Sequence, residues 1–81
     1  MTDSIEAQFR DWVTSERDGL RTTAYQLCSD WRLADDLVQE ALTRLFVVWA
    51  RVNRSGDPKG YARRILVNLY IDHRRRPSRR E

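Results

Sequence analysis

The stretch from Asp30 to Val52, DWRLADDLVQEALTRLFVVWARV, decides the predicted fold. Its apolar residues recur three and four positions apart, which is the spacing of one side of an α-helix. Ser29 or Asp30 offers an N-cap, so we expect one long helix that ends at about Val52. Its predicted buried side consists of Leu33, Ala34, Leu37, Val38, Ala41, Leu42, Leu45, Phe46, Val48, Trp49 and Val52.

The chain before this stretch predicts a helix capped by Asp3 or Ser4, an end or bend near Gly19, and a further helical segment to Cys28. After it, the polar residues from Asn53 to Gly56 predict a loop. Asp57 followed by Pro58 is typical of a helix start, and this last helix should stop before Pro77. It would bury Tyr61, Ala62, Ile65, Leu66 and Leu69. No segment alternates with a period of two, so we predict an all-α, compact three- to four-helix domain.

Composition narrows the class of protein. The 81 residues suffice for one small domain, and 41% of them are hydrophobic. Cys28, the only cysteine, forms no internal disulfide, and the acidic N-terminus does not fit a signal peptide. The longest uncharged apolar run, Leu45 to Ala50, is too short to span a bilayer. We therefore expect a soluble, cytoplasmic protein.

Charge is distributed unevenly. Lys and Arg together number 15 against 12 acids, for a net charge of +3. Most acids lie in the first half of the chain, whereas arginines gather after Lys59. A basic end of this kind indicates a polyanionic partner, either nucleic acid or an anionic membrane.

The long helix carries the first candidate binding stripe. Asp36, Gln39, Glu40 and Thr43 share one face of it, away from most of the apolar side. They form either an ordinary solvated face or a docking surface whose carboxylates accept arginine side chains of a partner. The spacing alone favours the solvated face.

The last helix carries the candidate DNA-binding stripe. Arg64, Asn68, Asp72 and Arg75 lie four, four and three positions apart. Asn and Arg can pair with base edges, and further arginines suit phosphates. The alternative is an exposed face held by pairs among these side chains, but the one-sided charge favours DNA. The flanking basic residues are Lys59, Arg63, Arg74 and Arg76.

Val67 and Ile71 do not fit the core stripe of the last helix. Either the N-terminal helix covers them through Phe9 and Trp12, which we slightly favour, or they form a second, bare apolar surface. Core packing is expected for most of the aromatic residues, which are Trp12, Tyr25, Trp31, Phe46, Trp49, Tyr61 and Tyr70.

No set of residues supports catalysis, a metal or a cofactor. His73 lies among arginines without companions for a metal site, and Cys28 has no nearby histidine to activate it. The segment from Asn53 to Asp57 by itself predicts an ordinary turn, although it could form one wall of a pocket for an unstacked base. We expect no enzyme activity.

Several motifs resemble those of extracytoplasmic-function sigma factors, most of all an actinobacterial subgroup. The run ADDLVQEA at 34–41 resembles the signature A-E-D-L-V-Q-E, and LRTTAYQL at 20–27 is similar to the family's first helix. The segment GDPKGYARRILVN at 56–68 resembles W-L-x-R-I-x-x-N, with Tyr61 in place of Trp. The ending DHRRR at 72–76 resembles D-x-x-R-R, so the match covers nearly the whole chain.

The resemblance implies region 2, the promoter-melting domain, which is a helical bundle. In it Asp36, Gln39 and Glu40, with Thr43 on the same face, would dock on the β′ clamp helices of RNA polymerase. The stripe of Arg64, Asn68 and Asp72 would recognise the −10 promoter element. A flipped base of the single-stranded non-template strand would enter a pocket formed by Val52, Asn53, Arg54, Ser55, Gly56 and Asp57.

The resemblance also implies a domain organisation. Residues 1–76 would form region 2, and residues 77–81 would begin a basic linker to a −35-reading domain that this chain lacks. Two other functions stay open: a stand-alone regulator that binds duplex DNA through its last helix, and a protein-interaction domain held by an anti-sigma factor. The expected partners are RNA polymerase core and promoter DNA, with an anti-sigma factor as a further candidate and no membrane.

Overall fold

The structure is a computed structural model that describes residues 4–75, which form helices and no strand. The helices are α1 (Ile5–Cys28), α2 (Trp31–Val47), α3 (Trp49–Ser55) and α4 (Pro58–Arg75). The predicted all-α, small helical domain is confirmed. Arg76 and the expected linker at 77–81 lie outside the described residues.

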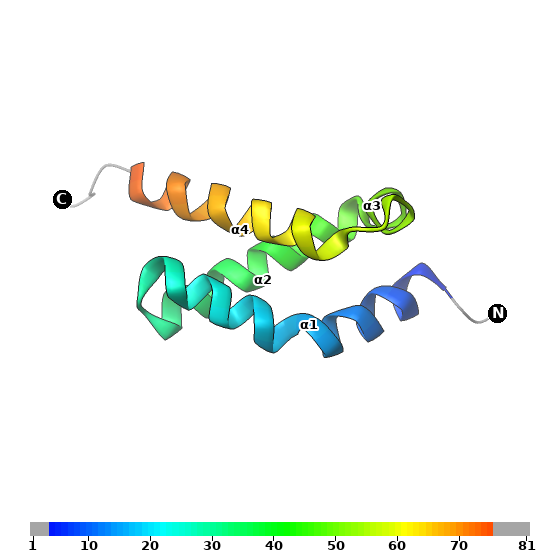
Figure 1. Cartoon of the computed structure of the whole chain (residues 1–81), viewed down its shortest axis with the longest axis horizontal. Helices are drawn as coiled ribbons and strands as arrows, with labels where there is room; N and C mark the ends of the chain where they lie inside the picture. The colour runs from blue at the N-terminus through cyan, green and yellow to red at the C-terminus, as the bar shows by residue number, and fades with distance from the viewer. Residues whose placement is uncertain (1–3, 76–81) are drawn as a thin grey trace.

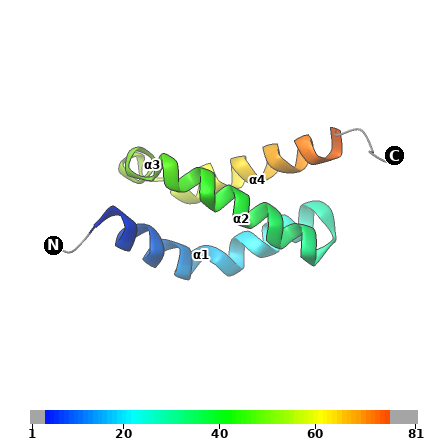
Figure 2. The ribbon, with the colours of Figure 1, turned by 180° about the vertical axis from the view of Figure 1, so that it is seen from behind.

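α2 is the central helix of the bundle. It runs in the opposite direction to α1 and α4, behind them in Figure 1 and in front of them in Figure 2. The short α3 is seen end-on in both views, because it crosses the end of the bundle where α4 begins. All four helices contribute to one apolar core, made of Leu20, Ala24, Ala34, Leu37, Val38, Ala41, Leu42, Leu45, Trp49, Val52, Ala62, Leu66 and Leu69.

Polar side chains cap the N-termini of three helices, as the sequence predicts. The Ser4 hydroxyl accepts a hydrogen bond from the Ala7 amide at 3.1 Å. The Asp30 carboxylate accepts from the amides of Arg32 and Leu33. Before α4, the Asp57 carboxylate accepts from the amide of Gly60 at 3.0 Å. Each cap satisfies amides that have no partner inside the helix.

Asp57→Ala should lower the free energy of unfolding by about 1 kcal/mol, because the Gly60 amide loses its acceptor. Asp57→Asn keeps an oxygen at that position and should retain most of the wild-type stability. Urea denaturation of both variants measures the difference. Equal losses in the two variants would show that capping is not what the Asp57 side chain contributes.

The predicted break at Gly19 was wrong, because α1 continues through it. A glycine inside a helix costs only about 1 kcal/mol relative to alanine. The next turn carries Leu20 and Ala24, which are buried in the core on the same helix. Burial of these side chains outweighs the local cost of the glycine.

The predicted long helix to Val52 was also wrong, because the chain breaks at Val48. The amide of Val48 donates to the Leu45 carbonyl at 3.1 Å, one residue short of the α-helical partner. Val47 and Val48 are adjacent β-branched residues, which weakens the helix at this point. The break turns α3 across the end of the bundle and brings Trp49 and Val52 into the core.

The connection between α3 and α4 is shorter than predicted. Asn53, Arg54 and Ser55 form the last turn of α3 and not a loop. Gly56 follows with a φ of 92°, a left-handed conformation that glycine adopts without steric cost. Gly56 and Asp57 alone link the two helices.

Two aromatic residues depart from the predicted core. Trp31 is 43% exposed and Phe46 is 41% exposed. Trp31 instead stacks on Tyr25 at the corner between α1 and α2, with ring centroids 4.0 Å apart. Phe46 packs at the edge of the core against Phe9, with centroids 5.1 Å apart.

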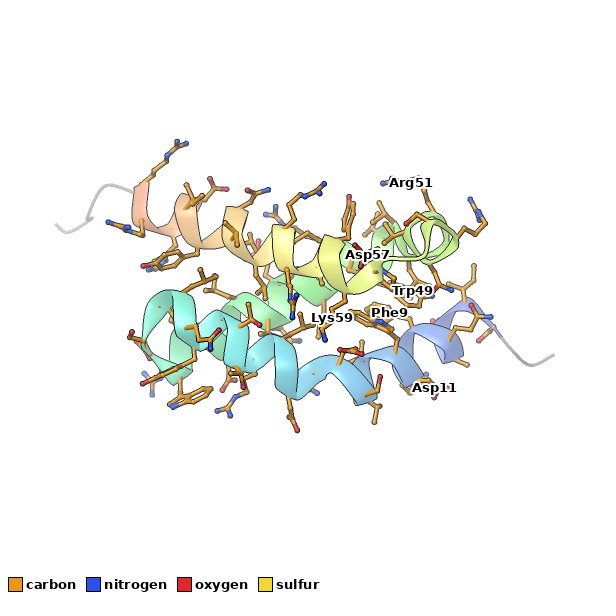
Figure 3. The ribbon with its side chains drawn as sticks, viewed as in Figure 1. Phe9, Asp11, Trp49, Arg51, Asp57 and Lys59 are labelled. Atoms are coloured by element: carbon orange, nitrogen blue, oxygen red, sulfur yellow. The ribbon has the colours of Figure 1, made fainter. Side chains whose placement is uncertain are left out.

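The N-terminal helix does not cover Val67 and Ile71, contrary to the explanation that we favoured. Phe9 and Trp12 pack against Trp49, with ring centroids 5.2 and 5.4 Å away, and Figure 3 shows Phe9 facing Trp49. Val67 and Ile71 are left 37% and 41% exposed on α4. The alternative explanation, a second apolar surface that is bare, describes the structure.

Candidate functional site

The outer ridge of α2 displays the first stripe. Asp36, Gln39, Glu40 and Thr43 are all exposed, because the core-facing positions of α2 are occupied by apolar residues. Glu40 forms an ion pair with Arg44 at 2.9 Å, one turn further along the helix. Asp36 forms no ion pair within residues 4–75. The ridge therefore offers an acidic and amide-bearing surface to a partner.

Hollows flank this ridge on both sides. Gln39 and Thr43 line one toward α1, which also contains Arg17 and is otherwise apolar. Its apolar lining consists of Phe9, Val13, Leu42 and Phe46. Asp36 and Glu40 line the other hollow, toward α4. The four residues of the stripe thus span the crest between two grooves.

Asp72 lies in the hollow between α2 and α4, with Asp36 and Glu40. His73 and Arg44 line the same hollow. Arg44 pairs with Glu40, so the three carboxylates still leave the groove with a net negative charge, which disfavours a nearby phosphate. The structure therefore places Asp72 at the border of the acidic ridge and not among the arginines of α4.

The outer face of α4 is basic. Arg63, Arg64, Arg74 and Arg75 are all exposed, and none of them forms an ion pair within the described residues. Asn68 is exposed on the same face. Pairs of Asp72 with Arg64 or Arg75, the structural alternative for this stripe, do not form. The arginines are therefore available to an anionic partner.

Comparison with known families decides what these surfaces belong to. The family model described as Sigma-70 region 2 matches residues 12–80. The chain belongs to the sigma-70 region 2 family. Neither the curated proteins nor the solved structures gave a significant match.

Sigma-70 region 2 is a domain of the sigma factors of RNA polymerase, which act in transcription initiation. Its partners are the RNA polymerase core and promoter DNA, and it works by binding and not by catalysis. An acidic ridge on one helix and a basic face on another are consistent with two such partners.

Within this sigma region 2 domain, Lys59 forms an ion pair, whereas the described arginines of α4 form none within residues 4–75. Its ammonium group is 3.5 Å from the Glu16 carboxylate, and Figure 3 shows it between α4 and α1. An exposed pair of this kind contributes at most about 1 kcal/mol to stability. Lys59 therefore ties α4 to α1 in the free domain.

The residues predicted to hold a flipped base do not share one surface. Val52 is 2% exposed and belongs to the core. Asn53, Arg54, Ser55, Gly56 and Asp57 are exposed around the turn into α4. In this conformation of the domain Val52 supports the turn from beneath, and the residues accessible to a base are those of the turn itself.

Arg51 is a candidate that the sequence did not reveal. It is exposed on α3, and its guanidinium lies 5.9 Å from the ring centre of Tyr61 on α4. Figure 3 shows it beside the turn that contains Asp57. The sequence placed Arg51 inside one long helix, and only the break at Val48 brings it next to α4.

Among residues 4–75 no group of His, Cys, Asp and Glu side chains is arranged to hold a metal ion. Within the same residues, no helix combines the length and apolar content needed to cross a membrane.

Proposed function

We propose that this chain is region 2 of an extracytoplasmic-function sigma factor, of the type similar to actinobacterial members. It docks on the clamp helices of the RNA polymerase β′ subunit through α2 and recognises and melts the −10 element through α4. The observation that carries this proposal is the division of charge. The acidic ridge and the basic outer face lie on different helices of one small domain.

Docking is assigned to Asp36, Gln39, Glu40 and Thr43. Their carboxylates accept arginine or lysine donors from a basic clamp helix, and Gln39 adds an amide that both donates and accepts. The ridge faces away from α1 and α4, because both pack on the other side of α2. Polymerase bound there leaves the outer face of α4 accessible to DNA.

Recognition of the opened promoter is assigned to α4 and the turn before it. The arginines Arg63, Arg64, Arg74 and Arg75 contact phosphates, and Asn68 pairs with a base edge. The turn at 53–57 binds one unstacked base of the non-template strand. Its capture offsets the cost of unstacking, which is a few kcal/mol. Asp72 limits how far the phosphates can extend toward α2.

An anti-sigma factor is a second proposed partner. The hollow between α1 and α2 is lined by Phe9, Val13 and Phe46, an apolar set that suits a protein side chain. Gln39 and Thr43 line its edge, so a protein bound there would block docking on polymerase. Both the polymerase and this inhibitor would meet the domain in the cytoplasm.

Binding of single and double strands tests the assignment of α4. The probe is a strand selected from a random pool. The selection uses the complex of this chain with core polymerase. The complex should bind the selected single strand more tightly than its duplex, with an affinity that falls steeply as salt is raised. Tight duplex binding by the chain alone, with no preference for the single strand, would indicate a stand-alone duplex regulator instead.

A further inference from the structure

The outer face of α4 combines apolar and basic residues in an ordered way. Val67 and Ile71 lie four positions apart, which places them one above the other on the helix. They are among the few large hydrophobic side chains that the described domain leaves exposed. Ile71 also lines a shallow hollow with Tyr70, Arg74 and Arg75. We call Val67 and Ile71 the aliphatic strip.

Arginines border the aliphatic strip on both sides. At 100° per residue, Arg64 and Arg75 fall on one side of it and Arg63 and Arg74 on the other. Arg74 lies 5.9 Å from the ring centre of Tyr70, which holds its guanidinium beside the strip. The strip is therefore a narrow apolar surface between two rows of positively charged side chains.

We propose that the aliphatic strip binds the base faces and C5-methyl groups of thymines in an unpaired DNA strand. The proposal rests on the function proposed above and adds a base preference to the same helix. A single strand carries regularly spaced phosphates and exposed base surfaces, which match the arginine rows and the strip between them. Aliphatic side chains recognise thymine through its methyl group.

A second copy of the chain fits this surface poorly. Two rows of arginines on each copy would face one another across a symmetric contact, which is repulsive. Two aliphatic side chains also fall far below the area of about 1,000 Å² that a stable interface needs. A polyanion with apolar surfaces is complementary to the charge of the arginines and to the small area of the strip.

The test compares oligonucleotides of twelve deoxythymidines and twelve deoxyuridines, which differ only in the methyl group. Fluorescence anisotropy with the full chain at low ionic strength gives the two dissociation constants. Wild type should bind the thymidine strand more tightly, by about fourfold for each methyl group that is buried. The double variant Val67→Thr with Ile71→Thr should bind both strands with the same affinity.

Val47→Thr is the matched control, because Val47 is 80% exposed on α2 and the same change is made away from α4. It should keep the preference for thymidine. Thermal melting checks that the variants fold, which is expected because the substituted side chains are exposed. A preference lost in the double variant and kept in Val47→Thr supports the inference.

Four outcomes would overturn it. Equal binding of both strands by wild type removes the thymine preference but leaves strand binding by α4 intact. A preference that survives in the double variant places thymine recognition elsewhere. If neither strand binds, the proposed function of α4 fails together with the inference. Sedimentation tests the remaining alternative, which is a second copy of the chain. A wild-type dimer that dissociates in the double variant would show that a second copy covers the strip.

Discussion

Asp36→Arg should weaken binding of the chain to core RNA polymerase by at least about 30-fold. The change places a cation where the proposed docking surface requires an acceptor, and a like-charge contact across an interface costs several kcal/mol. Asp36 is exposed and forms no ion pair within residues 4–75, so the substitution removes no ion pair among them. Gln39→Ala should have a smaller effect, about tenfold, because it removes hydrogen bonds without adding a repulsive charge.

Asp11→Arg is the matched control for charge. Asp11 is exposed on α1, and Figure 3 shows it pointing away from α4. The variant has the same net charge as Asp36→Arg but leaves the ridge of α2 unchanged. It should retain wild-type affinity to within about twofold, as expected for a charge outside the contact. An equal loss in both variants would mean that the overall charge, and not the ridge, determines binding.

Asn68→Ala should lower the affinity for a selected −10 strand by about 5- to 150-fold, because a paired contact to a base edge is worth about 1–3 kcal/mol. The affinity for a scrambled strand should change far less. Asn68 is exposed, and its side chain forms no hydrogen bond within the described residues, so the fold should not be affected. Titrations of both strands with the polymerase-bound chain measure the difference.

Arg75→Ala provides the contrast. A phosphate contact is independent of sequence, so this variant should weaken binding of the selected and scrambled strands alike. It should also reduce the slope of log affinity against log salt by about 0.7, the value for one phosphate on a single strand. Equal losses of Asn68→Ala on the two strands would refute base recognition by Asn68.

Local signals in the sequence predicted the helix starts and the last helix. Asp30 and Asp57 act through amides two or three residues away, so the printed sequence contains the whole interaction. Gly19 and Val48 were misjudged because the outcome depends on burial of neighbouring residues in a core formed by other helices. Helix propensity differs by about 1 kcal/mol at most for such residues, which packing readily overrides.

The candidate surfaces were predictable only as faces of single helices. Helical periodicity correctly placed Gln39 and Arg64 on exposed faces. It could not show that Asp72 shares a groove with Asp36, that Lys59 pairs with Glu16, or that Val67 remains bare. Each of these depends on how α4 is placed against α1 and α2, which a one-helix pattern does not specify. The resemblance to sigma factors supplied roles for residues but not these contacts.

The central claim is that one face of this domain binds polymerase while another binds the opened promoter strand. Size-exclusion chromatography of the wild-type chain mixed with core RNA polymerase and a labelled selected strand tests it most directly. We predict that chain, polymerase and strand elute together, that Asp36→Arg releases the chain, and that Asp11→Arg does not. A wild-type chain that elutes apart from polymerase, while still binding duplex DNA, would contradict the claim.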